Sequence, residues 1–149
     1  MLSLTSLGGA GTVTGSKHLL THDNTRLLID CGLFQGLKNL RELNWEGLPI
    51  AASDINAVVL THAHLDHSGY LPRLVREGFR GPIYATDATR DVAALILRDS
   101  AHLQEKDAEY ANRKGFSRHA VAEPLYRVRD ADRAITAMQS VAWHSPVDL

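Results

Sequence analysis

The chain has 149 residues, of which 44% are hydrophobic and 22% charged, a composition typical of one globular domain with a hydrophobic core. Its formal net charge of −1 lacks the overall basic character that marks many nucleic-acid-binding proteins. The single cysteine, Cys31, excludes an internal disulfide and fits a reducing compartment. Residues 1–4 show no basic segment leading into an apolar one, and no apolar run approaches the roughly 20 residues of a membrane span. We therefore expect a soluble, cytoplasmic protein that does not bind a membrane.

The first thirty residues predict three short strands. Residues 2–7 alternate apolar and small polar side chains, as a half-buried strand does. Residues 18–21 and 26–30 are apolar runs on either side of a short polar turn at residues 22–25, the pattern of a β-hairpin.

A glycine-rich stretch at residues 8–16 follows the first predicted strand. It is not a dinucleotide-binding fingerprint, because that motif must lead into a helix and no helical apolar pattern follows. Two interpretations stay open. The stretch is either a plain connection between strands or a loop whose backbone N–H groups face an anion.

The rest of the chain predicts an alternation of helices and strands within one domain, without repeats or a linker. The expected elements are an amphipathic segment at 36–44, a buried strand at 55–60, a helix at 68–77 stopped by Gly78, a strand at 81–85, a long helix capped by Thr86 or Asp87 and fading near residue 112, a polar loop at 113–123, a helix at 130–139 capped by Asp130, and the start of a strand at 141–144.

Four side chains that bind metals cluster where the predicted strand at 55–60 ends. They are His62, His64, Asp66 and His67. Loops at the carboxyl ends of strands are the usual place for a site in an α/β fold. His62 and His64 are two residues apart, so in an extended segment their imidazoles leave the same face. Imidazole suits zinc, copper, iron and nickel, and a carboxylate adds a hard ligand. Burying four such groups without a metal would leave several of them unsatisfied. The cluster therefore predicts half of a two-metal site.

Asp30 ends a predicted apolar strand, where a carboxylate is costly unless it is paired or near a metal. A role in holding a ligand histidine or a metal-bound water fits this position. For Cys31 we favour a small buried thiol over a metal ligand. The remaining histidines lack ligand-like neighbours and are assigned structural or exposed roles. Arg73, Arg76 and Arg80 could neutralise phosphates, and a solvated helix face explains them about as well.

Residues 62–67, His-Ala-His-Leu-Asp-His, resemble the signature of the metallo-β-lactamase fold. Residues 8–16, 30–36 and 68–72 resemble the RNA-processing branch of that fold that carries a β-CASP domain. That branch includes the cleavage-and-polyadenylation nuclease and its bacterial and archaeal exoribonuclease relatives. The likeness covers essentially the whole chain.

The resemblance implies an α/β fold, an αββα sandwich of which only the N-terminal half to two-thirds is present. Residues 1–149 would form the N-terminal part of a metallo-β-lactamase domain. The third-motif histidine, the bridging fourth-motif aspartate and the β-CASP insertion are expected beyond Leu149, and we do not assign His144 to the third motif. We expect part of a longer enzyme or a truncated gene product.

The resemblance also implies a zinc-dependent phosphodiester hydrolase acting on RNA, an endo- or exoribonuclease whose nucleophile is a metal-bound hydroxide. His62 and His64 match ligands of one zinc ion, and Asp66 and His67 match ligands of a second. Asp66 would also orient the hydroxide, and Asp30 matches the first-motif aspartate that supports the ligands. The implied partner is RNA, and a homodimer of the complete enzyme is compatible with the family.

Two alternatives stay open. One is a metal hydrolase of another substrate class on the same fold, acting on a thioester or a lactam. The other is a non-catalytic fragment or interaction subunit.

Overall fold

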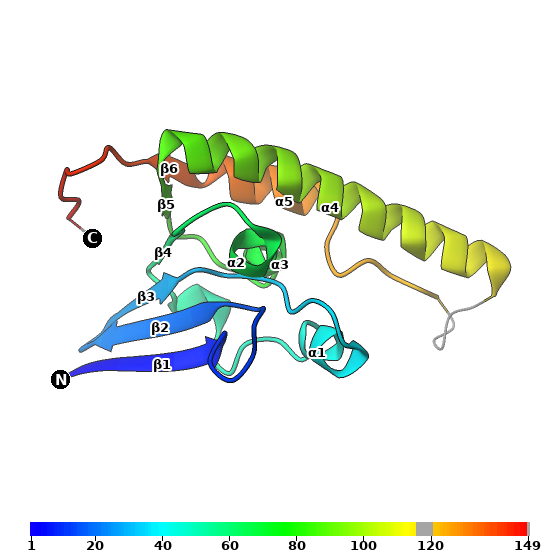
Figure 1. Ribbon diagram of the computed structural model, residues 1–149, viewed down its shortest axis with the longest axis horizontal. Coiled ribbons are helices and arrows are strands. Elements are labelled where there is room, and N and C mark those ends of the chain that lie inside the picture. The colour runs from blue at the N-terminus through cyan, green and yellow to red at the C-terminus, as the bar shows by residue number, and fades with distance from the viewer. Residues whose placement is uncertain (116–120, 149) are drawn as a thin grey trace.

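The computed structural model describes residues 1–115 and 121–148, and in that part of the chain six strands join in one sheet with the order β1-β2-β3-β4-β5-β6 (Figure 1). The strands are β1 (Leu2–Gly8), β2 (Lys17–His22), β3 (Thr25–Ile29), β4 (Ala57–Val59), β5 (Ile83–Ala85) and β6 (Met138–Ser140). Strands β1 to β3 pair antiparallel, and β3 to β6 pair parallel. The parallel half therefore brings the carboxyl ends of four strands to one edge of the sheet.

The helices lie mainly beside the parallel half of the sheet. They are α1 (Lys38–Leu43), the 3-10 helix η1 (Ala52–Asp54), α2 (Leu65–Ser68), α3 (Leu71–Arg76), α4 (Asp87–Lys114) and α5 (Val128–Thr136). Helix α5 packs against both α3 and α4, and the long α4 runs beside α5 on the side of the molecule opposite β1 (Figure 1). No helix within residues 1–115 and 121–148 combines the length and the apolar character needed to cross a membrane.

The core forms where the central strands meet these helices. Leu28, Val58 and Ile83 lie on the adjacent strands β3, β4 and β5, and all three are fully buried. Leu74 of α3 and Leu97 of α4 belong to the same buried cluster. Because this core fixes β3 against β4, it fixes the relative position of the two strand ends that carry the candidate site.

The N-terminal strands, the hairpin and the cap of the long helix are confirmed. The hairpin pairs His18 with Ile29 and His22 with Thr25. The Thr86 side chain caps α4 by accepting a hydrogen bond from the backbone N–H of Thr89 at 3.3 Å. The helix runs slightly past the predicted residue 112. Its last residue is Lys114, and Gly115 follows as the C-cap with a left-handed φ of 69°. Of the predicted polar loop at 113–123, residues 116–120 lie outside the described part.

The predicted helix at 68–77 is wrong in its start and its continuity. Two short helices replace it, α2 from Leu65 and α3 from Leu71. The Tyr70 N–H would continue α2 by donating to the carbonyl of Asp66, but it donates to the Cys31 carbonyl at 2.9 Å instead. The Asp66 carbonyl in turn accepts from the N–H of Ser16 at 2.9 Å. Contacts from distant segments thus divide a stretch that its local pattern predicts as one helix.

The C-terminal predictions are wrong in their boundaries. The last helix is Val128–Thr136, and Asp130 lies in its first turn, where its carboxylate accepts from the Arg127 N–H at 2.9 Å. Met138 is not on a helix face, because Met138–Ser140 form β6 and pair with β5. The predicted strand at 141–144 is therefore placed three residues too late. The predicted strand at 55–60 is shorter, Ala57–Val59.

The turn around α2 is held by backbone hydrogen bonds from the segment after β3. The Cys31 N–H donates to the His67 carbonyl at 2.8 Å, and the Leu33 N–H donates to the Leu65 carbonyl at 2.9 Å. Gly32 lies between these two bonds, and a Cβ at this position would overlap the carbonyl group of Asp66. Only glycine allows the two backbones to approach this closely.

Replacing Gly32 with alanine should therefore destabilise the protein strongly. We expect Gly32→Ala to lower the free energy of unfolding by about 3 kcal/mol, measured by urea denaturation, because backbone atoms must move apart. Gly36→Ala is the matched control: Gly36 has a φ of +87° and open space around it, so only backbone strain of about 1–2 kcal/mol is expected. Equal losses for the two variants would contradict the close approach at residue 32.

Candidate metal centre

Three imidazole rings converge just after β4. The ring centroids of His62 and His67 are 4.0 Å apart, and those of His62 and His64 are 4.8 Å apart. His62 and His64 lie in the irregular segment after β4, whereas His67 lies on the single turn of α2. The turn of α2 bends the chain back, so residues five apart in sequence come into ring contact.

The Asp30 carboxylate lies beneath this cluster. Asp30 follows β3 directly, has a left-handed φ of 58°, and is only 3% exposed. Its Oδ1 accepts from the Thr61 N–H at 2.8 Å, and its Oδ2 is 2.8 Å from Nδ1 of His67. Because a carboxylate only accepts, His67 donates through Nδ1 and keeps Nε2 available for a metal. The predicted role of Asp30, holding a ligand histidine, thus agrees with its contacts.

Thr61 extends the same network to His62. Its hydroxyl donates to the Asp30 carboxylate, with Oγ1 2.9 Å from Oδ2, and lies 2.9 Å from Nδ1 of His62. A hydroxyl that donates to Asp30 can accept from His62, which leaves Nε2 of His62 free as well. No role for Thr61 was predicted from the sequence. The available signal was its place at the strand end, directly before the first histidine.

Asp66 lies on the side of His67 away from Asp30. Its Oδ2 is 3.4 Å from Nε2 of His67, the nitrogen that Asp30 leaves free. Asp66 and His64 also line one pocket of about 530 Å³. All four predicted ligands are therefore gathered at one end of β4.

The chemistry of this donor set fits divalent cations, with two imidazoles oriented through Nδ1 and a carboxylate beside one of them. Within residues 1–115 and 121–148, no group of three or more His, Cys, Asp or Glu side chains is arranged to hold a metal ion. In the described residues the donors thus lie close to one another without forming a closed cage around one ion. The assignment of His62 and His64 to one ion, and of Asp66 and His67 to another, stays a prediction.

The contacts of other residues singled out in the sequence are now visible. Cys31 is fully buried, and this burial raises the pKa of its thiol to about 12, which disfavours the thiolate that a metal would need. Arg73 and Arg76 both donate to the carbonyl of Leu125 at 3.2 Å, so they hold the chain before α5, a role that neither of the two interpretations predicted. The glycine-rich stretch leads into β2, which confirms that it is no dinucleotide fingerprint.

Lys17 is a buried residue that the sequence did not reveal. It is 2% exposed, and its Nζ lies 4.3 Å from the ring centroid of Phe34 and 4.9 Å from that of Tyr70. Burial lowers the pKa of its ammonium group. Lys17 directly follows the glycine-rich stretch, so its contact with Phe34 connects that stretch to the segment after Asp30.

Comparison with known proteins agrees with this architecture. The profile of the metallo-beta-lactamase superfamily matches residues 11–131. Ribonuclease TTHA0252 of Thermus thermophilus is 44% identical over 105 residues, which are 70% of this chain and 24% of the relative. Transcription termination factor FttA of Cenarchaeum symbiosum is 38% identical over 152 residues, covering 96% of this chain and 23% of the relative. The solved subclass B3 metallo-β-lactamase MEM-A1, from a soil metagenome library, aligns with a TM-score of 0.48 and 18% identity over 91% of this chain and 43% of its own.

The chain belongs to the metallo-β-lactamase superfamily, because the match covers well over half of its residues. The predicted α/β fold class is thereby confirmed, and the fold implies divalent metal ions. The chain spans about a quarter of the length of these two curated relatives, which are named as a ribonuclease and a transcription termination factor.

Removing the Thr61 hydroxyl should weaken metal binding. We expect Thr61→Val to lower zinc affinity about 10- to 100-fold, because His62 loses the partner that orients its ring. Isothermal titration with zinc measures the effect, and Thr61→Ser, which retains the hydroxyl, should restore most of the affinity. Unchanged zinc binding by Thr61→Val would remove Thr61 from the network that orients the ligands.

Proposed function

We propose that the chain supplies part of a two-zinc site in a phosphodiester hydrolase that acts on RNA. The observation that supports this most directly is the convergence of His62, His64 and His67 above the buried Asp30 carboxylate. The name of the Thermus thermophilus relative, a ribonuclease, supports RNA as the substrate class. A cytoplasmic location and a homodimer of the complete enzyme stay predictions.

Each side chain has a distinct part in this proposal. His62, His64, His67 and Asp66 would hold the ions. Bound zinc would supply water with a pKa lowered from about 15.7 to about 7, and positive charge where the phosphate oxygens become more negative. Asp66 would orient the attacking water, and Asp30 would fix the ring of His67 so that its Nε2 faces the site.

The number of ligands limits what these residues do alone. A catalytic zinc ion usually has three protein ligands and a water. The proposed pairs offer two ligands for each ion, and the described residues contain no closed group of three. We therefore propose that residues 1–149 are the N-terminal part of a metallo-β-lactamase domain and that further ligands, with the leaving-group acid and a β-CASP domain, come from additional sequence.

Two other functions remain as alternatives. A thioester or lactam hydrolase would use the same donors, and a substrate panel on the longer protein separates it from a nuclease. A non-catalytic interaction subunit is disfavoured by the four intact donors and by the hydrogen bonds that orient two of them.

The isolated chain should bind zinc weakly and hydrolyse little or no RNA. Two ligands per ion leave each ion open to water and to competing chelators. Zinc titration followed by a cleavage assay on radiolabelled RNA measures both properties. Robust turnover by the purified 149 residues would contradict the incomplete ligand set.

In a longer protein that contains this domain, His62→Ala and Asp66→Ala should each abolish cleavage, with a loss of at least about a hundredfold in kcat. His102→Ala is the matched control, because His102 is an exposed residue of α4. Full activity in either site variant would exclude that residue from the metal centre, whatever the substrate.

A further inference from the structure

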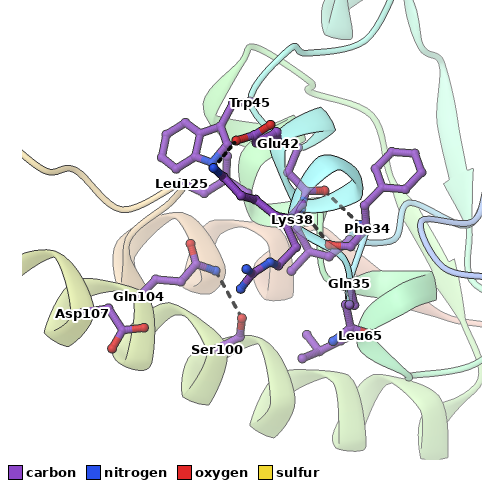
Figure 2. Close-up of a pocket in the computed structure, with 14 residues that line it drawn as sticks. Phe34, Gln35, Lys38, Glu42, Trp45, Leu65, Ser100, Gln104, Asp107 and Leu125 are labelled. Atoms are coloured by element: carbon purple, nitrogen blue, oxygen red, sulfur yellow. Dashed lines mark hydrogen bonds and ion pairs between the residues drawn. The ribbon is translucent and has the colours of Figure 1, made fainter. Parts of the chain in front are cut away.

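A second pocket adjoins the candidate metal centre. It has a volume of about 650 Å³ and lies between α1 and the middle of α4 (Figure 2). Gln35, Leu65 and Ser100 line both this pocket and the one that contains His64 and Asp66. A chain-like ligand reacting at the metal centre could therefore continue into this pocket, which we call the α1–α4 pocket.

The wall formed by α1 carries an aromatic ring and two cations. Trp45 is 53% exposed although it is a large apolar side chain. The Lys38 ammonium is 3.8 Å from Glu42, and both side chains are about 60% exposed, so this pair is weak. The Arg41 guanidinium has no ion pair or hydrogen bond to any residue in the described ranges. Trp45 and Lys38 lie on the wall opposite Ser100 and Gln104, and the Lys38 side chain extends toward Glu42 (Figure 2).

This wall is firmly attached to the metal centre. The Asn44 side chain, only 7% exposed, accepts from the Phe34 N–H at 2.9 Å and donates to the Phe34 carbonyl at 2.8 Å. The Leu33 N–H, one residue earlier, donates to the Leu65 carbonyl beside the metal ligands. The distance between α1 and the ligands is thus fixed by hydrogen bonds that connect them through residues 33 and 34.

We propose that the α1–α4 pocket binds the single-stranded RNA segment next to the cleaved phosphodiester, with Trp45 stacking on a base and Arg41 and Lys38 contacting phosphates. This inference rests on the proposed function. An exposed tryptophan beside an unpaired guanidinium is the combination that holds single-stranded nucleic acid, since every base has a π-face and every linkage carries a charge. The Ser100 hydroxyl is engaged by Tyr126 and by the Gln104 amide nitrogen, so the Gln104 amide oxygen is the group that faces a base edge. Asp107 on the same wall keeps phosphates on the α1 side.

The test measures RNA binding without cleavage. Fluorescently labelled single-stranded RNA of about ten nucleotides is titrated with the chain in EDTA, and fluorescence anisotropy reports Kd at several salt concentrations. Trp45→Ala should raise Kd about tenfold through lost stacking. Arg41→Ala should raise Kd and reduce the slope of log K against log salt by about one. Trp143→Ala and Arg129→Ala remove an exposed tryptophan and an exposed arginine away from the pocket, and should leave Kd unchanged.

A second measurement reports stacking directly. In the Trp143→Phe background Trp45 is the remaining tryptophan, and single-stranded RNA should quench its fluorescence, whereas an abasic ribose-phosphate oligomer of equal length should not. No RNA binding by the unmodified chain, equal Kd values for Trp45→Ala and the unmodified chain, or equal losses in the control variants would overturn the inference.

Failure of this inference is distinguishable from failure of the proposed function. If the longer protein cleaves RNA with unchanged KM after Trp45→Ala, the pocket is excluded and the hydrolase stands. If RNA quenches Trp45 but the zinc-loaded longer protein cleaves no RNA, the pocket stands and the proposed reaction is wrong.

Discussion

The candidate site depends on one buried carboxylate, Asp30. Taking a carboxylate out of water costs several kcal/mol unless strong hydrogen bonds replace the water. Asp30 recovers that energy from the Thr61 N–H, the Thr61 hydroxyl and Nδ1 of His67, all contributed by the segment that follows β4. The same bonds that make its burial tolerable therefore orient two imidazoles. The left-handed φ of 58° at Asp30 is an unusual conformation for a residue other than glycine, and this network maintains it.

Backbone contacts supply a second constraint that acts on the same turn. Short backbone hydrogen bonds from Ser16, Cys31 and Leu33 reach the carbonyls of α2. The bonds from Ser16 and Cys31 satisfy the carbonyls of Asp66 and His67, which the single helical turn leaves without intrahelical partners, whereas the Leu65 carbonyl also accepts from the Gly69 N–H at 2.8 Å. These bonds also explain why Asp66 and His67 lie on the single turn α2 and not on one longer helix. Because α2 begins directly after His64, the irregular segment before it brings His62 into ring contact with His67.

The features that the sequence predicts correctly are those set by neighbouring residues, and the missed ones depend on contacts between distant segments. The hairpin and the cap at Thr86 depend on neighbouring residues, and the structure contains both. The structure also brings the three histidine rings of the cluster together, whereas their role as ligands stays a prediction. The break between α2 and α3 depends on the distant carbonyl of Cys31, and β6 depends on pairing with β5, so neither could be read from a local pattern. Lys17 was hidden for a similar reason. A lysine at the start of a strand is normally exposed, and its burial follows from the rings of Phe34 and Tyr70.

The carboxylate that follows β5 is engaged away from the histidine cluster. The carboxyl ends of β3 and β4 carry Asp30 and the histidine cluster, and β5 leads to another carboxylate, Asp87. Asp87 is already engaged, because its Oδ1 accepts from the Ser140 hydroxyl at 2.6 Å and lies 3.6 Å from the Arg90 guanidinium. The Val141 N–H closes the same corner by donating to the Ala85 carbonyl at 2.9 Å. The β5–β6 end of the edge is thus satisfied within itself, so Asp87 does not join the donors at the ends of β3 and β4.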